Sequence, residues 1–90
     1  MKIIVSATVD LDGSVIELYP NPFSDHTSVK ISEDLQIQMI DLIDAQGRIV
    51  RTIDNVHSSS VTIQRGNLPG GIYFSRIHVD DIYTRKILIR

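Results

Sequence analysis

The residues that could do chemistry in this 90-residue chain are three histidines, a short serine run and a pair of aspartates. A zinc site needs histidine or cysteine ligands at close spacing, and His26, His57 and His78 have no such neighbours. We therefore interpret them as incidental surface histidines and predict no metal site.

The serines at residues 58–60 follow His57, an arrangement that could place a nucleophile beside a base. A serine nucleophile of this kind sits on a strand-to-helix elbow and needs an orienting acid, and the sequence indicates neither. Asp80 and Asp81 could bind calcium, but no ladder of carboxylates accompanies them. We predict a flexible loop and a tight turn at these positions, so an enzyme is the least favoured class and no cofactor is expected.

The composition is that of one compact domain, with 42% hydrophobic and 22% charged residues. A chain of this length can bury a core without metal or staples, and the absence of cysteine excludes disulfides and thiolate sites. A net charge of -2 and few aromatic residues argue against a nucleic-acid surface. Ser6 and Thr8 interrupt the first apolar stretch, and no run approaches the ~18 apolar residues of a membrane span. We expect a soluble chain that does not insert into a membrane and has no N-terminal export signal.

Charge is distributed unevenly along the chain. Residues 1–45 contain eight acids and two bases, whereas residues 46–90 contain three acids and seven bases. Because strands from both halves of a sandwich interleave, this asymmetry predicts cross-strand pairing rather than a polar molecule.

Apolar residues follow the period of strands. Seven short runs are rich in isoleucine, valine, threonine and tyrosine: residues 14–19, 27–31, 35–39, 48–53, 60–63, 72–79 and 83–89. A helix over residues 32–43 is disfavoured because Leu35, Ile37 and Met39 alternate with glutamines. The alternation changes phase after Met39, which predicts a β-bulge there.

Turn residues separate these runs. Gly47 follows Asp44 by three residues, as in a hairpin that ends on a left-handed glycine, and residues 69–71 are Pro-Gly-Gly before an apolar strand. Tyr73 and Phe74 fit a core position and a sheet face. A turn at residues 11–15 predicts that residues 2–9 pair with residues 14–19. The pattern favours an all-β fold, a small antiparallel immunoglobulin- or fibronectin-III-like sandwich of about seven strands.

The stretch YPNPF at residues 19–23 restricts the backbone strongly. Pro20 and Pro22 lack amide donors, and each pushes the preceding residue toward extended or polyproline geometry. The stretch therefore cannot be an interior strand, and we predict a sheet edge or a rigid bend that carries the chain to the next strand.

Four stretches follow one another along the chain, and their order is more specific than any one of them: LYPNPF, IDLIDAQGRIVRT, LPGGIYFSRI and the terminal YTRKILIR. Together they resemble the type A C-terminal sorting domain of the type IX (Por) secretion system, over about residues 14–90. The resemblance places recognition or fold-defining positions, none of them catalytic, on Tyr19, Pro20, Asn21, Pro22, Asp44, Gly47, Arg48, Leu68, Pro69, Gly71, Ile72, Tyr73, Lys86 and Arg90.

The resemblance implies a secretion signal in folded form. Such a domain follows a covalently attached N-terminal cargo protein, whose own signal peptide brings it to the periplasm. The partners would be the outer-membrane translocon, a shuttle and a sortase-like cysteine peptidase that removes the domain. The cargo is then released or anchored at the outer-membrane surface. On this view residues 1–13 are a linker or an extra N-terminal strand, which holds any cleavage site, and residues 14–90 are the sorting domain.

The last strand interleaves Arg85, Lys86 and Arg90 with apolar residues, so it could offer an edge for strand addition by a receptor. Basic residues on an edge also protect against aggregation, which is an equally good interpretation. Two alternatives to a sorting domain stay open: an adhesive or carbohydrate-binding module of a secreted protein, and an inert spacer. The absence of tryptophan speaks against stacking on sugars.

Overall fold

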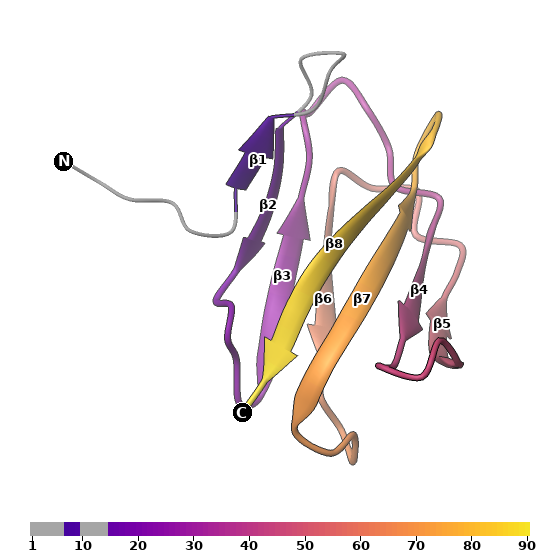
Figure 1. Ribbon diagram of the computed structural model, residues 1–90. Coiled ribbons are helices and arrows are strands. Elements are labelled where there is room, and N and C mark those ends of the chain that lie inside the picture. Colours follow the sequence, from indigo (N-terminus) through magenta and orange to yellow (C-terminus); the bar gives the residue numbers. More distant parts are fainter. Residues whose placement is uncertain (1–6, 10–14) are drawn as a thin grey trace, which may run out of the picture.

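The computed structural model describes residues 7–9 and 15–90, which form two antiparallel sheets packed face to face (Figure 1). The strands are β1 (Ala7–Val9), β2 (Val15–Tyr19), β3 (His26–Lys30), β4 (Met39–Ile43), β5 (Ile49–Ile53), β6 (Ser60–Gln64), β7 (Gly71–His78) and β8 (Ile82–Ile89). None of the described residues is helical, so this part of the chain has no helix that could cross a membrane.

One sheet has the strand order β1-β2-β3-β6 and the other β5-β4-β7-β8. The second order matches the C′-C-F-G sheet of immunoglobulin sandwiches, and β2, β3 and β6 take the places of strands A, B and E. The predicted all-β sandwich is thus confirmed, with seven strands between residues 15 and 89. The eighth, β1, pairs with β2 through Ala7 opposite Glu17, as the sequence predicted for this part of the chain. The predicted turn at residues 11–15 and the rest of residues 2–9 lie largely outside the described residues.

The core lies between the sheets and is built from alternate residues of each strand, because successive side chains of a strand point to opposite faces. Burial of each large apolar side chain contributes about 1.5–3 kcal/mol. The buried apolar residues are Ile16, Leu18, Phe23, Val29, Ile31, Ile37, Ile40, Leu42, Ile63, Tyr73, Ile77, Ile87 and Ile89.

Two strand predictions need correction, and both concern residues 35–43. The predicted strand at 35–39 is absent: Ile37 makes only an isolated bridge with Ser58, and β4 begins at Met39. The change of phase arises here, because the buried Ile37 lies before β4 and pairs with Ser58, whereas Ile40 and Leu42 are buried as part of β4. No bulge follows Met39 in the pairing of β4 with β7; the register shift lies on the β5 side, between Leu42 and Ile43.

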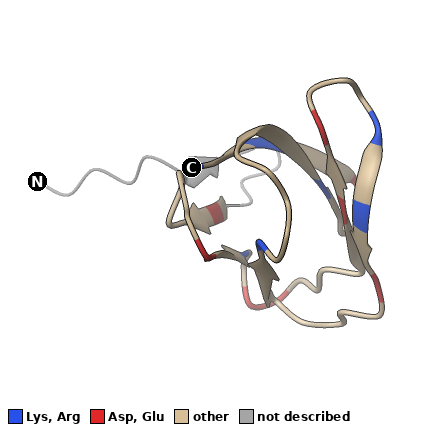
Figure 2. Cartoon of the chain, turned by 90° about the horizontal axis from the view of Figure 1, so that it is seen from below, with Lys and Arg blue, Asp and Glu red and all other residues tan. Residues whose placement is uncertain are grey.

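The two halves of the sequence interleave in space, as the charge distribution predicted. β6 lies beside β3, and β4 lies between β5 and β7. Acidic and basic positions are consequently interspersed around the sandwich (Figure 2). Asp41 illustrates the result: its buried carboxylate accepts a hydrogen bond from Thr52 and lies 3.9 Å from the Arg76 guanidinium.

Candidate functional site

The four sequence stretches that resemble a sorting domain meet at one end of the sandwich. The β2–β3, β4–β5 and β6–β7 connections and the last residues of β8 lie there, because antiparallel strands bring alternate connections to the same end (Figure 1). We call residues 20–25, 44–48, 65–70 and 86–90 the motif end. The sequence places these segments far apart, and the fold brings them together.

Asn21 joins the β2–β3 connection to the free edge of β8. Its side-chain amide donates a hydrogen bond to the Lys86 carbonyl at 3.2 Å and its Oδ1 accepts one from the Leu88 amide at 3.0 Å. The prolines on either side have no N–H to offer, so the asparagine side chain pairs with the strand where a backbone would normally do so. Both X-Pro bonds of the stretch, Tyr19-Pro20 and Asn21-Pro22, are cis.

Phe23 continues this pairing with its backbone. Its amide donates to the Leu88 carbonyl at 3.0 Å, its carbonyl accepts from the Arg90 amide at 2.9 Å, and it forms a parallel bridge with Ile89. Its ring is buried in the core, while the Thr27 hydroxyl donates to the Pro20 carbonyl at 2.7 Å. The predicted rigid bend is confirmed, and it carries the chain from the β2 sheet to the edge of the β8 sheet.

The outer edge of β8 is therefore partly covered. The Leu88 and Arg90 amides and the Lys86 and Leu88 carbonyls already have partners in residues 21–23. The predicted use of the last residues as an open edge for strand addition is wrong for 86–90, because those backbone groups are engaged.

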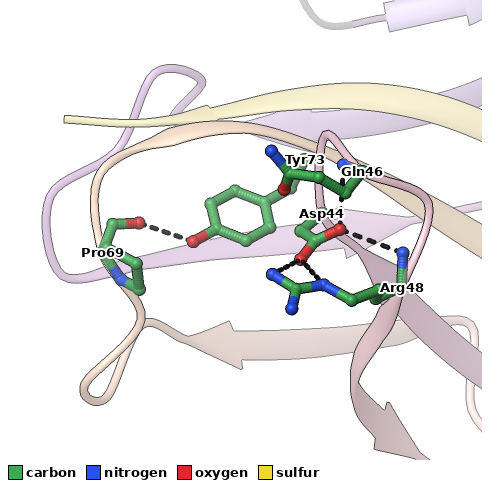
Figure 3. Close-up of polar contacts among 5 residues, drawn as sticks. All are labelled: Asp44, Gln46, Arg48, Pro69 and Tyr73. Atoms are coloured by element: carbon green, nitrogen blue, oxygen red, sulfur yellow. Dashed lines mark hydrogen bonds and ion pairs between the residues drawn. The ribbon is translucent and has the colours of Figure 1, made fainter.

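The hairpin between β4 and β5 is closed by the Asp44 carboxylate (Figure 3). Oδ1 accepts hydrogen bonds from the Gln46 and Arg48 amides at 3.0 and 2.9 Å, and Oδ2 accepts from Arg48 Nε at 2.9 Å and lies 2.8 Å from Nη2. Gly47 has a φ of 87°, the left-handed conformation that the sequence predicted for it. The motif residues of this hairpin thus determine its shape.

These bonds alter the acidity of Asp44. The Arg48 backbone amide, followed by the Arg48 guanidinium, lowers the pKa of the carboxyl below its usual value, because both favour the charged form. The carboxylate therefore stays ionised over the whole neutral range, and its hydrogen bonds hold the hairpin as long as it is charged.

The β6–β7 connection is held by Tyr73 and by the end of the chain. The buried Tyr73 ring donates its hydroxyl proton to the Pro69 carbonyl at 2.6 Å (Figure 3). The register that pairs Ile43 with Phe74 brings this ring next to the Asp44 hairpin. A Cβ at Gly70 would lie 2.9 Å from the Arg90 carbonyl oxygen, so the absence of a side chain lets the connection approach the chain end.

Arg65 also belongs to the motif end, although it lies in none of the four motif stretches. Its amide donates to the Asp25 carbonyl at 2.8 Å, and its guanidinium donates to the carbonyls of Ser24 and Leu68 at 3.2 and 2.9 Å. It thus ties the β2–β3 connection to the β6–β7 connection. An arginine in a loop has no local pattern that indicates carbonyl partners 40 residues away, so no sequence signal could have found it.

The remaining motif positions divide by exposure. Leu68 packs against the core, and Gly71, with a φ of 149°, begins β7 opposite Ile89. Other motif side chains are exposed instead, among them Tyr19, Ile72, Lys86 and Arg90. The motif therefore contains residues that hold the fold and residues that the fold leaves accessible.

The residues singled out for chemistry do not assemble. His26 lies 3.0 Å from the exposed Asp25, and His78 lies 3.1 Å from Asp41 on another face. In the described part of the chain no group of three potential ligands could hold a metal ion.

The serines at 58–60 are not a free loop. Ser58 forms a bridge with Ile37, and the Ser59 carbonyl accepts a hydrogen bond from the Ile31 amide, so the prediction of a flexible loop is wrong. The tight turn at 80–81 is confirmed by the Val79 amide, which bonds to the Asp81 carbonyl.

The fold and the motif end define a small β-sandwich domain of immunoglobulin topology whose connections are joined at one end. In a comparison with protein families, the model of the secretion system C-terminal sorting domain matches residues 17–90. The chain therefore belongs to this family. Searches among curated proteins and among solved structures gave no match. Family membership identifies the chain as a C-terminal sorting signal of type IX secretion, a role that ends at the outer membrane or outside the cell.

Proposed function

We propose that this domain directs an attached cargo protein across the outer membrane, and that the secretion machinery recognises the domain in its folded form. The observation that supports this best is the motif end, where the Asn21 side chain and the Phe23 backbone join the first motif stretch to the last, at separations of 65 and 67 residues for Asn21. A signal read as an unfolded tail would have no use for such distant contacts. The motif then specifies a shape as well as a sequence.

The cargo is attached upstream of the domain, with residues 1–13 as the linker and 14–90 as the sorting domain. The cargo reaches the periplasm first, and the domain is then recognised by the outer-membrane translocon and its shuttle. A sortase-like cysteine peptidase cuts within the linker, and the cargo is released or anchored at the cell surface. The domain itself is not an enzyme, binds no cofactor and does not insert into the membrane.

The test is a secretion assay with the whole chain. Residues 1–90 are fused behind a fluorescent protein that bears a periplasmic export signal, in a host with the type IX machinery and in one without it. We expect fluorescence outside the cell only in the first host. Retention in both hosts would reject the proposal, and secretion in both would show that the domain is not read by this machinery.

A matched pair of variants tests whether the link between Asn21 and β8, which shapes the motif end, is needed for secretion. Asn21→Ala removes the side-chain link to β8, whereas Asn67→Ala changes an exposed asparagine of the β6–β7 connection that makes no such link. We expect the first variant to reduce secretion and the second to leave it unchanged. Equal secretion by both would show that the link to β8 is not needed for recognition.

A further inference from the structure

The outer face of the β5-β4-β7-β8 sheet carries an exposed apolar area. Ile72 pairs with Leu88, Phe74 pairs with Ile43, and Ile43 pairs with Ile49, so all four strands contribute to it. Residues directly opposite each other on antiparallel strands share a face. We call Ile43, Ile49, Ile72, Phe74 and Leu88 the apolar quarter. It occupies the half of the face that adjoins the motif end.

These side chains remain accessible in the folded domain. The exposed fractions are 54% for Ile49, 46% for Ile72, 40% for Leu88 and 36% for Phe74. A half-buried strand normally alternates apolar with polar residues, but at this end β7 and β8 are apolar on both faces. A contiguous exposed apolar area is typical of an interaction site, because leaving it in water contributes nothing to the stability of the domain.

The outer face of the other sheet differs in composition from the apolar quarter. Cross-strand pairs there join Glu17 with Lys30 and Ser28 with Thr62. The described outward side chains of β2, β3 and β6 are polar apart from Tyr19, which lies next to the motif end: Glu17, His26, Ser28, Lys30, Ser60, Thr62 and Gln64. Over the described side chains of β2, β3 and β6, this outer face is thus mostly polar, in contrast to the apolar quarter.

Charge indicates what covers the apolar quarter. Two bases, Arg76 and Lys86, and one acid, Asp41, lie on the outer face of this sheet. Arg51 and Arg85 belong to the inner face, opposite the buried Leu42 and Ser75. Asp41 is 5% exposed and its carboxylate is already bonded to Thr52 and His78, so a partner cannot reach this negative charge directly. The exposed Lys86 lies directly opposite Phe74, inside the apolar area.

We propose that the apolar quarter and Lys86 form the docking surface for a protein component of the secretion machinery, one whose own surface has an apolar centre beside carboxylates. Complementary charge would steer this partner into register, while the apolar contact supplies affinity. A second copy of this chain fits less well, because a self-complementary interface would bring the outward bases Arg76 and Lys86 of both copies together. The inference rests on the proposed sorting function and names the surface that performs it.

The test compares substitutions in the apolar quarter with matched substitutions outside it. The double variant Ile72→Thr with Leu88→Thr removes apolar area from the quarter, and Ile82→Thr does the same at the far end of β8, where the exposed fraction is 56%. Lys86→Glu reverses charge in the quarter, and Lys30→Glu does so on the polar sheet. In the secretion assay we expect about a tenfold loss for both quarter variants and unchanged secretion for both controls, with the thermal unfolding midpoints of all four purified chains near that of the unaltered chain.

Each other outcome overturns the inference. Unchanged secretion by the quarter variants, while the unaltered chain is secreted, rejects the docking surface and leaves the sorting function standing. If the unaltered chain is not secreted, both the proposed sorting function and the proposed partner are rejected. Sedimentation of the purified chain covers a third case: a dimer that Ile72→Thr with Leu88→Thr dissociates would assign the surface to a second copy. Binding to vesicles of anionic lipid that Lys86→Glu abolishes would assign it to a membrane surface.

Discussion

The motif end and the apolar quarter lie next to each other, yet they use their residues in opposite ways. At the motif end, the polar side chains of Asn21, Asp44 and Tyr73 form hydrogen bonds with backbone groups of the same domain. In the apolar quarter, Ile72 and Leu88 keep much of their surface in water. The same sequence motif can therefore contain two kinds of residue, one that shapes the domain and one that the folded domain leaves exposed.

Mutations in the two regions should change the stability of the domain by different amounts. The largest difference is expected between two phenylalanines. Phe23→Ala removes a ring that is 2% exposed, and we expect a loss of about 3–5 kcal/mol in the free energy of unfolding, because a cavity is left in the core. Phe74→Ala removes a ring that is 36% exposed, so the loss should stay below about 1 kcal/mol. Urea unfolding of both variants measures the difference, and similar losses would contradict the division.

A smaller effect is expected at Gly70. Gly70→Ala places a methyl group 2.9 Å from the Arg90 carbonyl oxygen, so the β6–β7 connection or the chain end must shift. We expect about 1–3 kcal/mol of destabilisation, as for other overpacked sites. Gly47→Ala is the useful contrast, since its Cβ would meet no atom and its cost comes from a φ of 87°. Amide exchange at Arg90 should accelerate in the Gly70 variant and not in the Gly47 variant.

Asn21→Ala sharpens the comparison at a single side chain. The variant loses two hydrogen bonds to β8, at 3.2 and 3.0 Å, and solvent can replace part of each. We expect a loss of about 1 kcal/mol, in line with the net contribution of accessible hydrogen bonds. Hydrogen exchange of the Leu88 amide should become faster while that of Ile77, in the middle of β7, stays unchanged. An unchanged Leu88 rate would show that Asn21 does not cover the edge.

The smallest expected effect depends on pH. Because the folded domain lowers the pKa of Asp44, this carboxylate stabilises the fold above its unfolded pKa of about 3.9 and loses that effect as the pH falls through the folded value. Asp44→Asn should therefore be less stable than the unaltered chain at pH 7, and the gap should narrow at pH values below about 4. Unfolding free energies of both chains at pH 7 and pH 3 provide the measurement. A gap that is independent of pH would indicate that the charge of Asp44 is not involved.

Local sequence determined much of this domain. The alternation of apolar and polar residues predicted seven strands and found six of them close to their observed bounds, because side-chain direction in a strand has a period of two. Turn chemistry predicted the Asp44 hairpin and the turn at Asp80, since both depend on residues a few positions apart. The order of four short motifs was enough to indicate the family, which the match over residues 17–90 then showed.

Tertiary structure alone decided which groups meet across the sandwich. Asn21 finds its partners 65 and 67 residues away, and Arg65 bonds to Ser24 across 41 residues, distances at which no local pattern carries information. Ile37 falls out of phase with β4 because it lies outside that strand and pairs with Ser58, 21 residues further along the chain. The apolar quarter likewise exists only once four strands are in register, because its five side chains come from four separate segments whose neighbours are set by pairing and not by sequence.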